Sequence, residues 1–234
     1  MPLTLALPDR AALLLDCDGT LIDLAATPDS VVVPDGLLDG LRRLRERLDG
    51  ALAVVSGRPV AQIDALLGDA PTAVAGEHGA SLRLTPGGEL IHVELPAPPA
   101  AWIAAATATV VAFPGALVEH KRRGFVLHYR QAPAAALILE RLAREMVAED
   151  TRFTVLPAAM AWEVRALGVD KGTAVAAIMA AAPFAGRVPV FVGDDVTDAD
   201  GMAEARRRGG QGLFVPEVFG DAAGVRAWIA SLVR

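Results

Sequence analysis

Cysteine is almost absent from this sequence, and long apolar runs and an excess of positive charge are absent too. The single cysteine, Cys17, excludes an internal disulfide bond and is typical of a protein from a reducing compartment. The longest apolar runs have the length of a strand, which predicts no membrane-spanning helix and no membrane partner. The first ten residues lack the basic and apolar regions of a signal peptide, so we expect a cytoplasmic protein.

The 22 basic and 28 acidic side chains give a formal net charge of −6. This balance argues against nucleic acid as the main partner. The one basic cluster, Arg206-Arg207-Arg208, stands directly before two glycines. Cations at that place would complement the negative end of a helix dipole, so we interpret the cluster as a solvated helix end. Nothing in the sequence indicates an obligate protein partner.

Lysine is the scarcest of the basic residues. Only Lys121 and Lys171 are lysines among the 22 basic side chains. A chain that otherwise uses arginine is expected to use lysine where a compact point charge is needed. Both lysines are therefore candidate functional residues.

Apolar residues are abundant, at 53% of the chain, which predicts a well-filled core. Short apolar segments without alternation are typical of strands that are buried on both faces of a parallel sheet. Helical periodicity separates them, as in 35–48, where Asp35 is a candidate cap and Gly50 a candidate stop. We predict an α/β fold with a Rossmann-like parallel sheet, whose strands are 11–15, 51–55, 72–75, 188–192 and 213–215.

The segment Pro-Ala-Pro-Pro at 96–99 marks the point at which the order of predicted helices and strands changes. It follows a predicted hairpin and precedes a helix, two strands, a second helix and two further strands. We therefore predict a larger domain formed by 1–96 and 167–234, and a smaller α+β (αββαββ) domain formed by 97–166 with one open sheet face. The predicted elements around and within the smaller domain are 81–84, 90–94, 100–112, 117–122, 125–130, 134–148, 153–156 and 161–165.

Polar clusters follow four of the predicted parallel strands. Because the carboxyl ends of parallel strands meet at one edge of a sheet, we expect these clusters to lie together. Adjacent carboxylates resist burial unless a cation lies between them, and oxygen ligands with a phosphate favour Mg²⁺. We predict a magnesium site formed by Asp16, Asp18 and Asp194. The clusters are Asp16-Cys17-Asp18-Gly19-Thr20, Ser56-Gly57-Arg58, Gly76-Glu77-His78-Gly79 and Gly193-Asp194-Asp195.

Phosphoryl transfer requires a nucleophile, charge neutralisation and donors around the phosphate. Asp16 is the candidate nucleophile, since a carboxylate can form an aspartyl-phosphate. Asp18 is the candidate general acid and base. Cys17 is a poor nucleophile because the flanking carboxylates raise the pKa of its thiol, and we interpret it as a small apolar filler.

Other residues of these clusters are candidates for supporting roles. We expect Ser56, Gly57 and Lys171 to bind phosphate oxygens, and Asp195 and Asp198 to orient the metal ligands. Ser56 has an alternative role as a helix cap before Pro59. Lys171 has a weaker alternative, because a cation at a helix start opposes the dipole.

The order Asp-x-Asp-Gly-Thr, Ser-Gly-Arg, Lys-Gly and Gly-Asp-Asp-x-x-Asp resembles the four motifs of the haloacid dehalogenase (HAD) phosphatases, and the insertion resembles their C2-type cap. From about Ala12 to Val215, the sequence is similar to the trehalose-6-phosphate phosphatase family within that superfamily. The segments that carry this similarity are Gly76-Glu77-His78-Gly79, Glu119-His120-Lys121, His128-Tyr129-Arg130, Trp162-Glu163-Val164-Arg165, Asp170-Lys171-Gly172 and Gly193-Asp194-Asp195-Val196-Thr197-Asp198.

The resemblance implies Mg²⁺-dependent hydrolysis of trehalose 6-phosphate, a small-molecule sugar phosphate, through a phospho-aspartate. It also implies that residues of the cap contact the sugar, and we add two residues of the strand-end clusters to this set. The sequence departs from the family pattern at Ala199 and Ala166. The candidate substrate-binding residues are Arg58, His78, Glu119, Lys121, His128 and Glu163.

Other interpretations remain open at this point. The enzyme could act on another sugar phosphate, such as sucrose-phosphate or mannosylglycerate-phosphate, or be a phosphomannomutase. A non-catalytic sugar-phosphate sensor would be expected to lack Asp16, Asp18 or Asp194, and all three are present. A nucleotide-binding module is disfavoured because no Gly-x-x-x-x-Gly-Lys-Ser/Thr occurs. Glu119, Lys121 and Glu163 could also be ordinary polar strand residues, and His78 a structural histidine.

Overall fold

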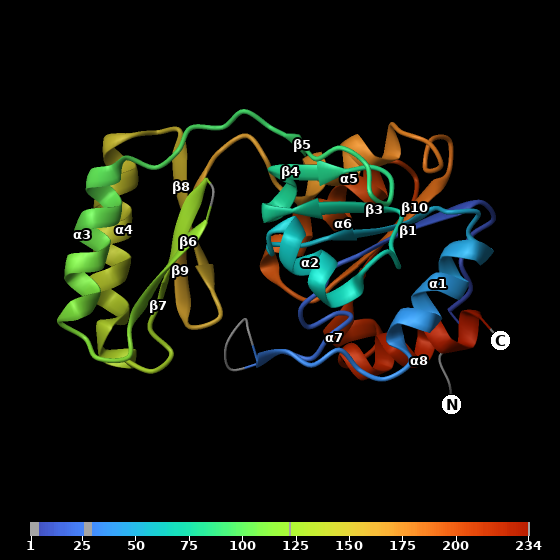
Figure 1. Ribbon diagram of the computed structural model, residues 1–234, viewed down its shortest axis with the longest axis horizontal. Helices are drawn as coiled ribbons and strands as arrows, with labels where there is room; N and C mark the ends of the chain where they lie inside the picture. Colours follow the sequence, from blue (N-terminus) through green and yellow to red (C-terminus); the bar gives the residue numbers. More distant parts are fainter. Residues whose placement is uncertain (1–4, 26–29, 122, 234) are drawn as a thin grey trace. The chain divides into compact units, whose positions relative to one another are not determined.

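The computed structural model describes residues 5–25, 30–121 and 123–233. The chain divides into a larger unit, Met1–Val93 with Val169–Arg234, and a smaller unit, Glu94–Gly168. The larger unit contains a seven-stranded sheet, and the smaller unit contains a four-stranded sheet (Figure 1). No described helix is long and apolar enough to cross a membrane.

The sheet of the larger unit has the strand order β11-β10-β1-β2-β3-β4-β5. The first five strands in this order are parallel, and β4 and β5 continue the sheet as an antiparallel hairpin. Every residue of β1, β2 and β3 is buried, as expected for strands covered on both faces. The strands are β1 (Ala11–Leu15), β2 (Leu52–Val55), β3 (Ala73–Gly76), β4 (Ser81–Arg83), β5 (Ile91–His92), β10 (Val188–Gly193) and β11 (Gln211–Phe214).

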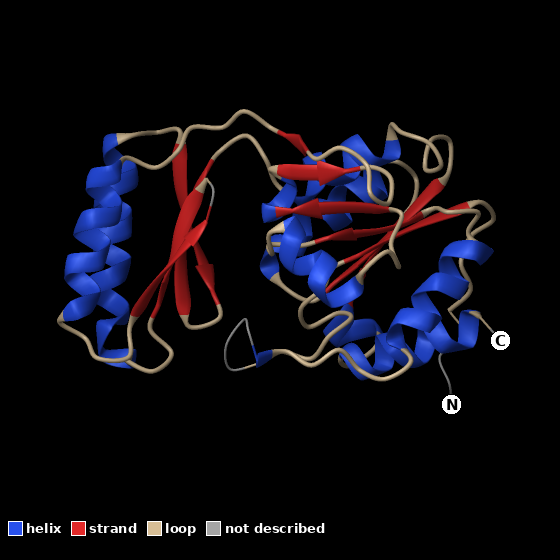
Figure 2. Ribbon diagram, viewed as in Figure 1, coloured by secondary structure: helices blue, strands red, loops and turns tan. Residues whose placement is uncertain are grey.

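Helices lie on both sides of this sheet (Figure 2). Among them, α1 packs against α8, and α5 packs against α6. The predicted parallel α/β architecture is therefore confirmed. The helices of the larger unit are α1 (Leu37–Arg47), α2 (Val60–Leu67), α5 (Lys171–Met179), α6 (Ala199–Arg207), α7 (Val215–Val218) and α8 (Ala222–Leu232), with short 3₁₀ turns η2 (Glu77–Gly79) and η4 (Val196–Asp198).

Two local predictions in the larger unit are wrong. Asp35 does not cap α1, because Gly36 occupies the N-cap position with φ 76° and has no side chain that could accept a hydrogen bond. The last strand of the sheet is 211–214 rather than 213–215, since Val215 begins α7 and Pro216 favours a helix start. Asp170 caps α5, since its carboxylate accepts a hydrogen bond from the Thr173 N–H.

The smaller unit is an antiparallel sheet with the order β6-β7-β9-β8 and two helices on one of its faces (Figure 1). This arrangement is the αββαββ unit that the sequence predicts. Arg122, the last residue of the predicted strand 117–122, lies outside the described residues. The elements are α3 (Ala100–Val111), β6 (Leu117–Lys121), β7 (Gly124–His128), a 3₁₀ turn η3 (Pro133–Ala135), α4 (Ala136–Glu149), β8 (Phe153–Ala158) and β9 (Ala161–Ala166).

Apolar side chains fill the space between the two helices and the sheet of the smaller unit. Trp102 of α3 meets Phe153 of β8 edge to face, with ring centroids 5.2 Å apart. Phe125 and Val164 are fully buried in the same cluster. Because side chains alternate along a strand, the neighbours of these apolar residues lie on the opposite, open face of the sheet. That face carries the polar residues that the sequence singles out.

Candidate active site

The polar clusters follow four adjacent parallel strands, β3, β2, β1 and β10, and therefore lie at one edge of the sheet. Backbone hydrogen bonds join the loops that leave these strands. The His78 N–H donates to the Ser56 carbonyl at 3.0 Å, and the Glu77 N–H donates to the Arg58 carbonyl at 3.0 Å. The loop after β3 therefore supports the loop after β2.

A buried lysine joins two buried carboxylates at this edge. The Lys171 ammonium, at the start of α5, lies 2.6 Å from Oδ1 of Asp16 and 2.6 Å from Oδ1 of Asp198. The exposed fractions of Asp16, Lys171 and Asp198 are 5%, 3% and 0%. Burial by itself lowers the pKa of Lys171, but the two carboxylates outweigh it and raise that pKa above its ordinary value. Lys171 therefore stays charged and holds Asp16 in place.

A third carboxylate completes this group. Asp16, Asp194 and Asp198 each offer an oxygen, and these oxygens lie within 4.8 Å of one another. Burial raises the pKa of Asp16 well above its ordinary value, and Lys171 opposes the rise only in part. Burial and the nearby Asp198 raise the pKa of Asp194 to about 6. Three carboxylates around one ammonium leave an excess of negative charge, and an all-oxygen donor set of this kind fits Mg²⁺.

Asp198 lies closer to the centre of this group than the sequence suggests. Its Oδ2 accepts hydrogen bonds from the backbone N–H groups of Asp194 and Asp195, both at 3.0 Å. Gly193 is required beside it, because a Cβ there would lie 2.3 Å from Cγ of Asp198. Asp195 is exposed, and its carboxylate accepts from the Val196 N–H at 2.6 Å. Asp198 therefore fixes the loop after β10, while Asp195 stabilises the turn that follows.

Asp18 has a different partner. Its two carboxylate oxygens accept hydrogen bonds from Nε and Nη2 of Arg58, both at 2.6 Å. Paired bonds of this kind fix orientation as well as charge. In this structure Arg58, a predicted substrate-binding residue, therefore positions the Asp18 side chain beside the end of β1.

Ser56 and Gly57 occupy a tightly packed loop. Ser56 is 1% exposed, and its hydroxyl accepts from the Arg58 N–H at 3.2 Å. The alternative role of Ser56 as a helix cap is wrong, because Pro59 is the N-cap of α2 and no side chain caps this helix. A Cβ on Gly57 would lie 2.8 Å from the His78 imidazole, so glycine permits this close approach.

His78 stands in an unusual backbone conformation. Both His78 and the preceding Glu77 have positive φ values, 58° and 51°. Each such non-glycine residue costs roughly 1–3 kcal/mol and persists only where surrounding contacts hold it. The backbone hydrogen bonds to Ser56 and Arg58 supply such contacts. Two of the five described non-glycine residues with positive φ therefore lie at this edge of the sheet.

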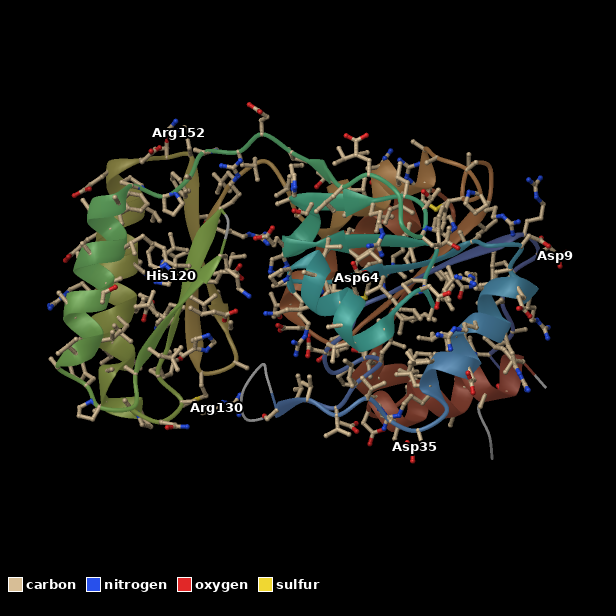
Figure 3. The ribbon with its side chains drawn as sticks, in the orientation of Figure 1. Asp9, Asp35, Asp64, His120, Arg130 and Arg152 are labelled. Carbon is tan, nitrogen blue, oxygen red and sulfur yellow. The ribbon has the colours of Figure 1, made fainter. Side chains whose placement is uncertain are left out.

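The predicted residues of the smaller unit form their own cluster. Glu119 accepts hydrogen bonds from Nζ of Lys121 at 2.5 Å and from Nε2 of His128 at 2.8 Å. Burial raises the pKa of Glu119, but these two partners lower it more, to about 2. Glu163 lies in the same cross-strand row as Glu119, with Val126 between them. His120 points toward the helix side of the sheet (Figure 3), so its neighbours Glu119 and Lys121 lie on the open face.

Residues 14–228 match the family model described as Trehalose-phosphatase. The chain belongs to the trehalose-phosphatase family. It is 42% identical over 207 residues to the trehalose-6-phosphate phosphatase of Escherichia coli (strain K12), a match that covers 88% of this chain and 77% of that protein. Members of the trehalose-phosphatase family are phosphomonoester hydrolases, and this chain is therefore an enzyme of that class.

Solved structures show the same fold. The C-terminal domain of Candida albicans trehalose-6-phosphate phosphatase has a TM-score of 0.79 at 20% identity, over 96% of this chain and 92% of that chain. A haloacid dehalogenase-like hydrolase from Bacteroides thetaiotaomicron has a TM-score of 0.66 at 12% identity, over 94% of this chain and 98% of that chain. This trehalose-phosphatase family member therefore has the HAD fold.

Thr20, the last residue of the cluster after β1, has no role predicted from the sequence. The Thr20 hydroxyl is fully buried and donates to Oδ1 of Asp194 at 3.2 Å. Gly19 has φ 76°, and a Cβ there would lie 2.1 Å from Oδ2 of Asp194. Both residues hold the trehalose-phosphatase carboxylate cluster together. The Gly-Thr pair directly after two strand-end acids is the signal that could have indicated this.

Cys17 has the role that the sequence predicts. It is fully buried and belongs to the hydrophobic core of the larger unit. Burial, and then the neighbouring carboxylates of Asp18 and Asp16, raise the pKa of its thiol well above the ordinary value. A thiol of this kind is inert, so Cys17 fills space.

Proposed function

We propose that the chain hydrolyses trehalose 6-phosphate to trehalose and inorganic phosphate with Mg²⁺ as cofactor, acting in the cytoplasm. The observation that carries this proposal is the group formed by buried Asp16 and Asp198 and partly buried Asp194, with Lys171 bound to the first two, at the carboxyl edge of the parallel sheet. The family supports a phosphatase, and the printed name of the Escherichia coli relative supports the substrate.

Asp16 is the proposed nucleophile. Lys171 contacts Oδ1 of Asp16, so we assign the attack on phosphorus to Oδ2. The new Oδ2–P bond forms as the bond between phosphorus and the sugar oxygen breaks, and the sugar oxygen takes a proton from Asp18, which gives a phospho-aspartate and the free sugar. Water then attacks the phosphorus, releases inorganic phosphate and restores the Asp16 carboxylate.

Asp18 is the proposed general acid and base. Its proton passes to the departing sugar oxygen in the first step, and its carboxylate accepts a proton from the attacking water in the second. Arg58 holds both oxygens of Asp18 and therefore fixes the position from which the proton is transferred. Proton transfer from a positioned side chain contributes roughly 10²- to 10⁴-fold to the rate of such steps.

Different residues are proposed to bind the phosphate and the metal ion. We assign the phosphate oxygens to Ser56, the Gly57 backbone and Lys171. Asp16, Asp194 and the backbone of Asp18 would hold Mg²⁺, with Asp198 orienting the loop that carries Asp194. The ion supplies positive charge that neutralises the phosphoryl oxygens.

The cap is proposed to bind the sugar. Glu119, Lys121, His128 and Glu163 supply hydrogen-bond donors and acceptors on one face of its sheet. Glu119 is held as a carboxylate by its two partners, so the cluster is built before any ligand binds. Sugar hydroxyls can both donate to and accept from such groups, and a ligand without them would leave these groups unpaired.

The test is phosphate release from a panel of substrates. The panel contains trehalose 6-phosphate, sucrose 6-phosphate, glucose 6-phosphate, mannosylglycerate phosphate and p-nitrophenyl phosphate. We expect the highest kcat/KM with trehalose 6-phosphate, complete loss of activity in EDTA and recovery with added Mg²⁺. A higher kcat/KM with another sugar phosphate would contradict the substrate, and undiminished hydrolysis in EDTA would contradict the cofactor.

A further inference from the structure

One cationic side chain on the open face of the smaller unit, Arg165, has no role in the proposed function. Arg165 lies on β9, the strand that also carries Glu163. Trp162, Val164 and Ala166 of β9 pack into the hydrophobic cluster beneath the helices. Because side chains alternate along a strand, Arg165 and Glu163 lie together on the opposite, open face.

One N–H donor of the Arg165 guanidinium, that of Nε, is left unsatisfied. Its Nε is buried and has no hydrogen-bond partner among the residues that the structure describes. Nε of Arg123, in the turn between β6 and β7, is in the same state, whereas Arg144 pairs with Glu140 and Arg152 pairs with Asp150. A buried donor without a partner costs free energy, so a group of this kind in a folded protein requires an explanation. A bound ligand that accepts from Nε would remove that cost.

Arg165 shares a cross-strand row with a glycine and a second cation. Gly124 of β7 pairs directly with Arg165, and Lys121 of β6 pairs with Gly124 from the other side. A Cβ on Gly124 would lie 2.2 Å from the Val164 carbonyl oxygen, so a larger residue does not fit without movement of the strands. In this row across the sheet, Lys121 and Arg165 therefore flank Gly124, which has no side chain.

The charges on this face favour a neutral ligand. The strands of the face carry two carboxylates, Glu119 and Glu163, and an equal number of permanent cations, Lys121 and Arg165. A phosphate dianion would meet two carboxylates here, whereas hydroxyl groups can donate to the carboxylates and accept from the cations. The guanidinium also offers two parallel N–H donors, from Nε and one Nη, which match two adjacent oxygen atoms.

We propose that Arg165 is a further specificity-determining residue, whose guanidinium donates from Nε and one Nη to two neighbouring hydroxyls of the sugar. This inference rests on the proposed function. It adds to Glu119, Lys121, His128 and Glu163 a residue that binds the neutral part of the substrate.

The test compares Arg165→Gln and Arg165→Lys with the unmodified chain on two substrates. Hydrogen bonds from a charged donor are among the stronger ones, so both variants should lose about 10- to 100-fold in kcat/KM for trehalose 6-phosphate, mostly through KM. Hydrolysis of p-nitrophenyl phosphate, which has no sugar hydroxyls, should stay within about twofold. Lysine should not restore activity, because an ammonium lacks the paired donors.

The matched control is Arg141→Gln, the same change at an exposed position of α4, which packs on the other face of the sheet. It should leave both substrates unchanged. A readout without the natural substrate is inhibition of p-nitrophenyl phosphate hydrolysis by trehalose. The inhibition constant should rise about 10-fold or more in Arg165→Gln, and circular dichroism should show an unchanged fold.

The outcomes separate this inference from the proposed function. Equal losses on both substrates would assign Arg165 to the phosphate or to folding, and full activity of Arg165→Lys would exclude the paired donors. Either result, or an unchanged kcat/KM in Arg165→Gln, would overturn the inference while trehalose 6-phosphate remains the preferred substrate. Failure of the unmodified chain to prefer trehalose 6-phosphate would instead overturn the proposed function.

Discussion

The two units of the molecule each contain a cluster in which one charged group is shared by two partners, an ammonium in the larger unit and a carboxylate in the smaller. In the larger unit one ammonium, Lys171, is shared by the carboxylates of Asp16 and Asp198. In the smaller unit one carboxylate, Glu119, is shared by Lys121 and His128. The excess of negative charge in the first cluster favours a cation and the chemistry of phosphate. The near balance in the second favours hydrogen bonding to neutral groups.

Burial separates the two clusters as clearly as charge does. The side chains of Lys171 and Asp198 are 3% and 0% exposed, whereas those of Lys121 and Glu119 are 16% and 24% exposed. Burial raises the pKa of Asp194 to about 6, while the partners of Glu119 lower its pKa to about 2. A buried carboxylate surplus is unfavourable without a cation, but a half-exposed paired carboxylate is stable by itself.

The largest expected effect comes from the nucleophile. Asp16→Asn keeps the size of the side chain and removes the attacking carboxylate, so kcat for trehalose 6-phosphate should fall by roughly 10⁴-fold or more. The matched control, Asp39→Asn, changes a carboxylate that is 82% exposed on α1 and should leave kcat unchanged. Steady-state kinetics on both variants checks this. Near-normal turnover by Asp16→Asn would remove Asp16 from the chemistry.

The next largest expected effect is on stability. It tests how much the buried contacts of Asp198 contribute to the free energy of unfolding. Asp198→Ala removes the acceptor for Lys171 and for two backbone N–H groups. Loss of one partner from a buried pair costs about 3–5 kcal/mol, and relief of repulsion with Asp16 offsets only part of this. Urea unfolding in EDTA should show a decrease of this size in the free energy of unfolding.

Asp195→Ala is the control for that change. Asp195 is exposed and accepts one backbone hydrogen bond, so its loss should cost about 1 kcal/mol. Equal effects of the two substitutions would mean that the buried contacts of Asp198 contribute little to stability.

These two residues also show what the sequence could and could not predict. The unbroken apolar runs identified the parallel strands, and the strand-end position of Asp16, Asp18 and Asp194 indicated their common edge. Asp198 was predicted only to orient the metal ligands, because sequence spacing does not reveal that a short 3₁₀ turn returns its carboxylate to the backbone of Asp194. The pairing of Asp18 with Arg58 joins positions 40 residues apart and depends on how two loops pack.

The cluster of the smaller unit illustrates the same limit. Alternation predicted that Glu119 and Lys121 share a face, but the partner His128 is fixed by the register of β6 and β7, which the sequence does not state. The predicted cap at Asp35 failed for a local reason, since Gly36 with a positive φ takes the N-cap position. Predictions from periodicity therefore succeeded where burial dominates, and those that depend on pairing required the structure.

The smallest expected effect concerns pH and the smaller unit. The pKa of Glu119 is about 2 in the folded chain and lower than its ordinary value of 4.5. Its contribution to stability is therefore fully present above about pH 4.5 and is lost as the pH falls toward 2. Urea unfolding of the unmodified chain and of Glu119→Gln should differ at pH 5, and the difference should shrink as the pH falls below 4.5. A difference that grows on acidification would contradict the assigned pairing.

The central claim is that the cluster of the larger unit carries out the phosphate chemistry, while the cluster of the smaller unit binds the sugar. One ratio tests this claim most directly. That ratio is kcat/KM for trehalose 6-phosphate divided by kcat/KM for p-nitrophenyl phosphate, measured with Mg²⁺ in the unmodified chain, Lys121→Ala and Asp194→Asn. Lys121→Ala should lower the ratio by about 10- to 100-fold, because only the sugar contacts are lost. Asp194→Asn should depress both activities and leave the ratio within about twofold. A ratio that is unchanged in Lys121→Ala, or that falls equally in both variants, would contradict the account.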